Sequence, residues 1–176
     1  MAKHINKRKR LRRLALLSCH FTRNLAYTRA WTREIGGRDY SQILITINNN
    51  FIDMAVMEWC KIFADKRGKH YWESIVNYQN FKIDMLSHIC IKEARFENYI
   101  KEMLHYRDKF IAHLDDEDTM NIPRLDIAEK AVLFLYDHLV LQEASEGDLD
   151  QLPTNLPSYY RQCFNEVSPI IGTSEL

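Results

Sequence analysis

Apolar residues recur at intervals of three and four along most of the chain, which is the spacing of one face of an amphipathic helix. The clearest case lies in and just before the segment 99–118, YIKEMLHYRDKFIAHLDDED, where apolar positions step by 4, 3, 7 and 4. These positions are Phe96, Ile100, Met103, Phe110 and Leu114. The pattern predicts a long helix over about 92–114, ending before an acidic run that is unfavourable at a helix C-terminus.

The same spacing predicts further helices elsewhere. Long ones are expected over about 8–33, 40–64 and 123–143, and short ones over about 70–78, 81–90 and 158–166. The apolar face of the helix over 40–64 is expected to comprise Leu44, Ile47, Phe51, Met54 and Ala55. Gly36 and Gly37 suit the end of the first helix, and Pro123 suits the first turn of the last long one. Residues 143–157 are expected to form a loop. Four long helices with short connections predict an all-α fold, a mainly antiparallel four-helix bundle with short extra helices.

Composition agrees with one helical domain. The chain has 176 residues, 46% of them hydrophobic, with only 5 Gly and 4 Pro. We therefore expect residues 1–176 to form a single domain, with a basic N-terminal arm (1–13) and a loop with a C-terminal extension (144–176). The four cysteines form no C-x-x-C pair, which predicts free thiols in the cytoplasm and no metal site or cofactor. No apolar run reaches membrane-spanning length, so no membrane partner is expected.

Charge is uneven although the net charge is zero. Residues 1–33 hold ten of the 24 basic residues and no acidic one. This segment suits an arm that binds RNA phosphates or an acidic partner surface, and a solvated helix start is the alternative. The candidate RNA-binding residues are Lys7, Arg8, Lys9, Arg10, Arg12 and Arg13.

Two polar residues occupy core positions of the helix over 92–114. Arg107 falls where the first apolar stripe calls for a core residue. A second stripe runs beside it through Tyr99, Met103, Tyr106 and Phe110, and His113 is its next position. An arginine keeps its charge and is rarely buried without a partner. One alternative pairs Arg107 with a buried carboxylate such as Asp53 or Glu58 and makes His113 an ordinary helix-end histidine. The other makes both residues catalytic.

The segment YRDKFIAHLDDEDTMNIPRLDIAEKAVLFLYDHL resembles the signature end of HEPN domains. Their hallmark is an arginine, often followed by a polar residue, and then a histidine after four to six residues; here these are Arg107, Asp108 and His113. With NNFIDMAVMEWCKIFADKRGKHYWESIV before it, the chain resembles the abortive-infection (AbiU-like) branch over roughly residues 40–140. The resemblance implies a helical, metal-independent endoribonuclease, a toxin or phage-defence effector. It also implies a homodimer whose motifs face each other, with Asp108 orienting the site.

A single histidine is an incomplete acid–base site, because RNA cleavage by its own 2′-hydroxyl needs both a base and an acid. A two-fold dimer would supply two histidines and two arginines. The resemblance also implies an antitoxin or other defence-system protein as partner. One departure is Asp115, which stands where toxins regulated by nucleotidyltransferases often have tyrosine. Many HEPN domains are non-catalytic, so a module that binds a protein or nucleotide is the alternative function.

Overall fold

The computed structural model describes residues 2–35, 41–112 and 121–172, and this part of the chain is helical with no strand. The α-helices are α1 (Ala2–Ile35), α2 (Gln42–Phe63), α3 (Phe81–His88), α4 (Glu93–Tyr106), α5 (Asp126–His138) and α6 (Leu156–Gly172). Segments of π-helix follow two of them, Arg107–Ala112 after α4 and Leu139–Glu143 after α5. The predicted all-α class is confirmed.

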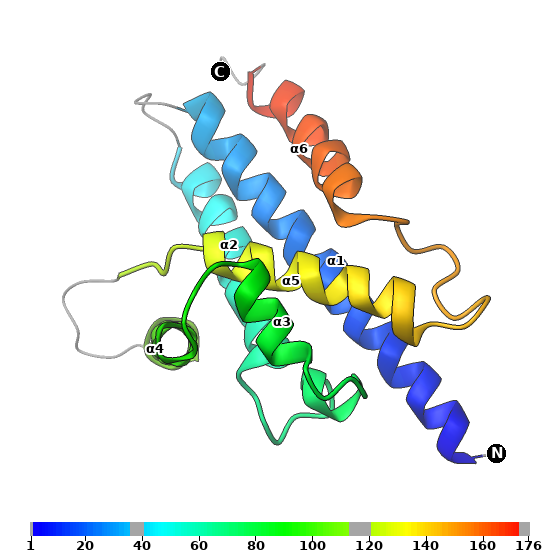
Figure 1. Ribbon diagram of the computed structural model, residues 1–176. Helices are drawn as coiled ribbons and strands as arrows, with labels where there is room; N and C mark the ends of the chain where they lie inside the picture. The colour runs from blue at the N-terminus through cyan, green and yellow to red at the C-terminus, as the bar shows by residue number, and fades with distance from the viewer. Residues whose placement is uncertain (1, 36–40, 113–120, 173–176) are drawn as a thin grey trace.

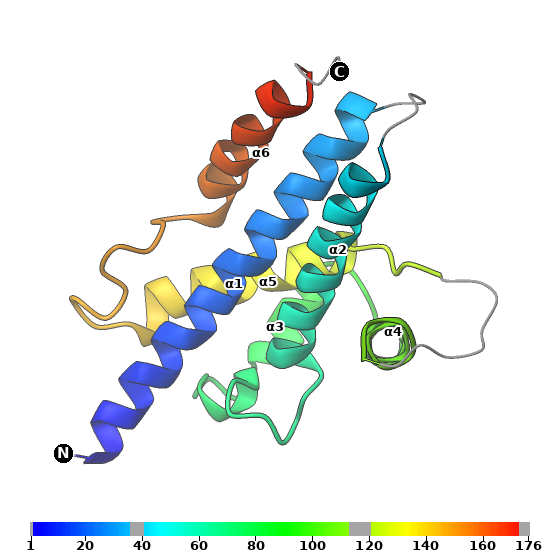
Figure 2. The ribbon, with the colours of Figure 1, turned by 180° about the vertical axis from the view of Figure 1, so that it is seen from behind.

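Helix α1 is the axis of the molecule (Figure 1). Its 34 residues span about 50 Å at 1.5 Å per residue. Helix α2 packs antiparallel to it on one side and α6 runs parallel to it on the other, while α5 crosses it (Figures 1 and 2). Small buried residues let these neighbours approach closely: Ala15, Ser18, Ala26 and Ala30. The segment expected to be a separate arm is the first part of α1, and its Leu11 is buried.

Helix α4 is seen end-on in both views and therefore runs across α1 and α2 (Figures 1 and 2). Four buried aromatic rings join it to α2. Trp59 stacks on Phe63 with centroids 5.2 Å apart, and it meets Tyr99 edge-on at 5.3 Å and Phe96 at 6.1 Å. Such pairs add about 0.5–1.5 kcal/mol each beyond burial. This cluster fixes the direction of α4 and so positions the Arg107 segment that follows it.

Several predicted boundaries are wrong. The expected helix over 70–78 is only a 3-10 turn, Trp72–Ser74, in a segment rich in aromatic, β-branched and asparagine residues of low helix propensity. Pro123 precedes α5 instead of lying in its first turn, and α6 is longer at both ends than expected. Pro157 is in the first turn of α6, a position that tolerates proline.

Helix α2 also differs from its predicted packing. Ile47 and Met54, expected to face inward, are 40% and 45% exposed. The buried residues of α2 begin at Ala55, and in this second half Trp59 and Phe63 pack against rings of α4. Ile43 and Ile45 are exposed as well, at 68% and 41%. The first half of α2 therefore leaves an apolar face uncovered.

Candidate functional site

Arg107 follows α4 directly and is the first residue of the π-helical segment. The stripe that predicted this helix is correct, since Tyr99, Met103 and Tyr106 are buried. The Tyr106 hydroxyl donates a hydrogen bond to Oδ1 of Asp53 at 2.8 Å, which ties the end of α4 to α2. Arg107 itself is only partly buried, with 20% of its side chain exposed. It lies where the core meets the surface.

Two carboxylates bind the Arg107 guanidinium. Its Nη1 lies 2.5 Å from Oδ1 of Asp65 and its Nε lies 2.8 Å from Oδ1 of Asp108. Burial alone would lower the pKa of Arg107, but hydrogen bonds to Asp108 and Asp65 and the charge of Asp65 raise it above its ordinary value. The guanidinium is therefore charged and held in one orientation. Its Nη2 takes part in neither ion pair.

Arg107 does pair with carboxylates, as one alternative expected, but the two examples named for it were wrong. Asp53 accepts the Tyr106 hydroxyl, and Glu58 binds Nζ of Lys61 at 3.1 Å instead. Asp65, which lies just beyond the end of α2, was missed. It was not detectable from spacing, since 42 residues separate it from Arg107.

The helix changes its hydrogen bonding at the motif. The six residues Arg107–Ala112 form π-helix, in which each N–H bonds five residues back. Segments of π-helix are rare and occur frequently at functional sites. Within this segment Asp108 is exposed and contacts the arginine that we expected it to orient. His113 lies outside the described residues, so its place on the same broad helix face as Arg107 stays a prediction.

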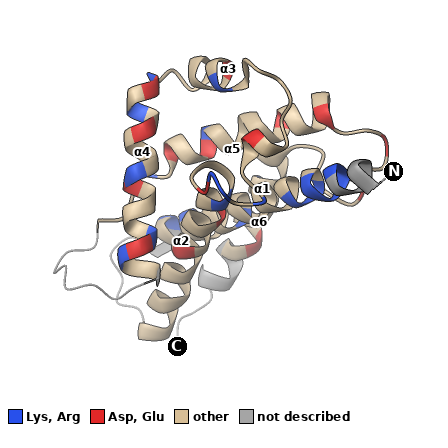
Figure 3. Ribbon diagram, turned by 90° about the horizontal axis from the view of Figure 1, so that it is seen from below, with Lys and Arg blue, Asp and Glu red and all other residues tan. Residues whose placement is uncertain are grey.

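The basic residues of α1 divide between two faces. Three of them bind the π-helical segment after α5 or the loop that follows it. Nζ of Lys7 lies 3.1 Å from Oε2 of Glu143. Nε of Arg8 lies 2.7 Å from Oδ1 of Asp148, and Arg12 donates to the Asp148 and Asp150 carbonyls. Figure 3 shows this contact as acidic and basic ribbon side by side near the N-terminus.

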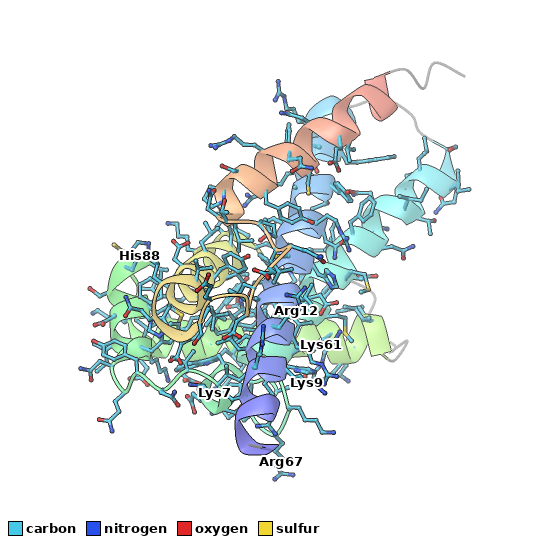
Figure 4. The ribbon with its side chains drawn as sticks, turned by 90° about the vertical axis from the view of Figure 1, so that its right-hand side faces the viewer. Lys7, Lys9, Arg12, Lys61, Arg67 and His88 are labelled. Carbon is cyan, nitrogen blue, oxygen red and sulfur yellow. The ribbon has the colours of Figure 1, made fainter. Side chains whose placement is uncertain are left out.

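Lys9, Arg10 and Arg13 make no ion pair within the described ranges, and Lys9 and Arg13 are exposed. Figure 4 shows Lys7 and Lys9 on opposite sides of α1, with Lys61 on the side of Lys9. The six candidate RNA-binding residues are therefore not equivalent: three are engaged with the protein itself, and three are available to a ligand.

A groove of about 520 Å³ lies beside α4. It is lined by side chains of α4 and of the segment leading into α5, among them Arg95, Tyr99, His105 and Arg124. The Tyr99 hydroxyl donates to the Arg124 carbonyl at 2.8 Å and so fixes one wall. Neither His105 nor Arg124 was a candidate from the sequence.

All four cysteines are free thiols, and only Cys90 is exposed. In the parts of the chain that the structure describes, no three His, Cys, Asp or Glu residues gather as metal ligands would. The helices described there include none whose length and apolar character would suit a membrane span. Comparison of the chain with protein-family models, with curated proteins and with solved structures found no match.

Proposed function

We propose that this protein is a HEPN-like, metal-independent endoribonuclease, acting as a toxin or phage-defence effector through a composite dimer site of Arg107, Asp108 and His113. The main observation in support of the proposal is that the guanidinium of Arg107, at the end of α4, is held in one orientation. Asp65 and Asp108 hold Arg107 by two different nitrogens and leave Nη2 outside both ion pairs. An arginine held this way is prepared to bind a phosphate without losing further side-chain freedom.

In the proposed reaction, the 2′-hydroxyl of RNA attacks the adjacent phosphorus and the 5′-oxygen of the next nucleotide leaves. The two His113 side chains of a dimer serve as base for the hydroxyl and acid for the leaving oxygen. The arginines stabilise the charge that develops on the phosphate oxygens. Asp108 and Asp65 act as positioning residues because they touch Arg107 rather than the substrate.

The uncovered face of α2 supports the dimer. Ile43, Ile47 and Met54 are exposed on this helix, and Asp53 of the same helix binds Tyr106 at the end of α4. A second copy that covers this face would therefore lie next to the motif. Introducing charge there with Ile43→Asp and Ile47→Asp should give a monomer by light scattering and abolish cleavage, while the far-UV spectrum stays helical.

The alternative is a non-catalytic module that binds a nucleotide or a protein. The groove beside α4 favours it, because its volume of about 520 Å³ could hold a small ligand between Arg95 and Arg124, which are paired there with Glu102 and Asp126. Binding there would be independent of Arg107.

The test compares wild type with Arg107→Ala and His113→Ala for toxicity on expression and for cleavage of mixed RNAs in EDTA. Arg95→Ala serves as matched control, since it also removes an arginine bound to a carboxylate on α4. We expect cleavage by wild type and control only. Equal behaviour of all four proteins would refute the nuclease and favour the binding module.

A further inference from the structure

A tight turn presents positive charge just beyond the end of α2. The Asp65 N–H binds the Cys60 carbonyl at 2.9 Å, and the Gly68 N–H binds the Asp65 carbonyl at 2.6 Å. A Cβ on Gly68 would lie 2.9 Å from that carbonyl oxygen, so any larger residue would require the backbone of the turn to shift. The turn carries Lys66, Arg67 and Lys69 and leads into a buried aromatic pair, Tyr71 and Trp72. The backbone of the turn therefore holds these charged residues in fixed positions.

The turn lies close to the side of α1 that carries Lys9, Arg10 and Arg13. Burial lowers the pKa of His70, and the positive charges of Arg13, Lys61, Lys69 and Arg10 lower it further, so all four lie within electrostatic reach of one imidazole. Figure 3 shows the basic part of this turn next to the basic part of α1, and Figure 4 shows Lys9, Lys61 and Arg67 toward the same end of the molecule.

The basic surface comprises Lys9, Arg10 and Arg13 of α1 with Arg67 and Lys69 of the turn. In the described part of the chain none of these five makes an ion pair. Three carboxylates close in sequence to the turn interact elsewhere: Asp65 binds Arg107, Glu58 binds Lys61, and Glu73 interacts with Tyr71. Like charges brought together without counter-charges repel each other and destabilise the fold. An anionic ligand would remove that cost.

We propose that the basic surface binds the phosphate backbone of an RNA strand and leads it to Arg107. The proposal rests on the proposed nuclease function. Its link to that site is Asp65, which belongs to the same turn and holds the guanidinium of Arg107. Tyr71 and Trp72 are buried, so the turn offers no exposed ring on which bases could stack. Contacts to phosphates alone make the binding independent of sequence and strongly dependent on salt.

The test measures binding of a fluorescent 2′-O-methyl oligouridylate of about 20 nucleotides, a probe that lacks the attacking hydroxyl and cannot be cleaved. The triple variant Arg10→Gln, Arg13→Gln, Lys69→Gln is compared with wild type over a salt series. The control triple Lys92→Gln, Lys130→Gln, Arg161→Gln removes the same charge from exposed positions outside the basic surface. Circular dichroism checks that both variants are folded.

We expect the first triple variant to bind about tenfold or more weakly at low salt. Its slope of log affinity against log salt should be shallower by about 2, since each lost phosphate contact on a single strand removes about 0.7. The control should match wild type. Equal binding by both variants, or tighter binding of polyglutamate than of RNA by wild type, would overturn the proposal. Because the probe is not cleaved, failure of the nuclease proposal would appear separately, as absence of cleavage by wild type.

Discussion

The ion pair between Arg107 and Asp65 can be tested by Asp65→Asn, which keeps the shape and one acceptor oxygen but removes the charge. The pair joins the turn after α2 to the end of α4 with Nη1 and Oδ1 2.5 Å apart. Arg107 keeps its contact with Asp108 in the variant. The substitution therefore weakens one of the two contacts of the guanidinium and leaves it paired with Asp108.

The expected cost follows from the exposure of the two side chains, 20% for Arg107 and 37% for Asp65. Fully exposed pairs contribute about 0.2–1 kcal/mol. Breaking a fully buried pair costs about 3–5 kcal/mol. The intermediate exposure and the remaining Asp108 contact place the loss of unfolding free energy at about 1–2 kcal/mol. If the guanidinium acts in the transition state, cleavage should fall about tenfold for each 1.4 kcal/mol of lost stabilisation, mainly in kcat.

Urea unfolding at neutral pH measures the first quantity, and single-turnover cleavage measures the second. Glu102→Gln is the matched control, because it removes the charge from an ion pair of α4 in which both side chains are 48% exposed. Its cost should stay below about 1 kcal/mol. A loss for Asp65→Asn no larger than that of the control would show that Asp65 does not hold Arg107. A clear stability loss with unchanged cleavage would make the pair purely structural.

Three further predictions concern the rest of the fold. Glu143→Gln should lower the unfolding free energy by about 1–3 kcal/mol and speed amide exchange in the first turns of α1, because a carboxylate only 7% exposed loses its ion pair with Lys7; exchange confined to α6 would contradict this. Burial raises the pKa of Cys19 to about 11 and of Cys60 to about 12 from 9.0. Because the fold favours the neutral thiols, their contribution to the unfolding free energy is complete below pH 9 and is lost as pH rises through 11 to 12. Urea unfolding at pH 8 and at pH 11 should show this loss of stability. Only Cys90 is exposed, so one thiol per native chain should react rapidly with a disulfide reagent, and Cys90→Ser should remove that phase.

Local periodicity predicted what depends on neighbours three and four residues apart. It identified the buried stripe of α4 through Tyr99, Met103 and Tyr106, because a helix that crosses the core must bury one face. It overestimated the burial of α2, since Ile47 and Met54 have the right spacing but are 40% and 45% exposed. Spacing along a chain reports which residues share a face, but it does not report what covers that face.

The candidate site also separates into features that local spacing predicts and features that depend on tertiary packing. The motif residues Arg107 and Asp108 were identified from sequence, and the structure shows them in contact. Asp65 was missed because it comes from another element, and its approach depends on how α2 and α4 cross. The pairing of Lys7 with Glu143 is also long-range, across 136 residues. Ion pairs between elements require the tertiary arrangement and leave no periodic signal.

The division of the basic residues of α1, in contrast, follows from helical geometry and their positions in the sequence. With 3.6 residues per turn, successive residues are about 100° apart, so Arg8 and Arg12 share one side while Arg10 lies about 200° from Arg8. Lys9 and Arg13 are again four apart and lie on the side of Arg10. A helix packed against an acidic loop can offer only one of these sides to it. Arg8 and Arg12 bind that loop, so the charges left for a ligand are those of Lys9, Arg10 and Arg13. If these free charges bind RNA as proposed, substitutions on the side of Arg8 and Arg12 should affect stability, while those on the side of Arg10 should affect binding.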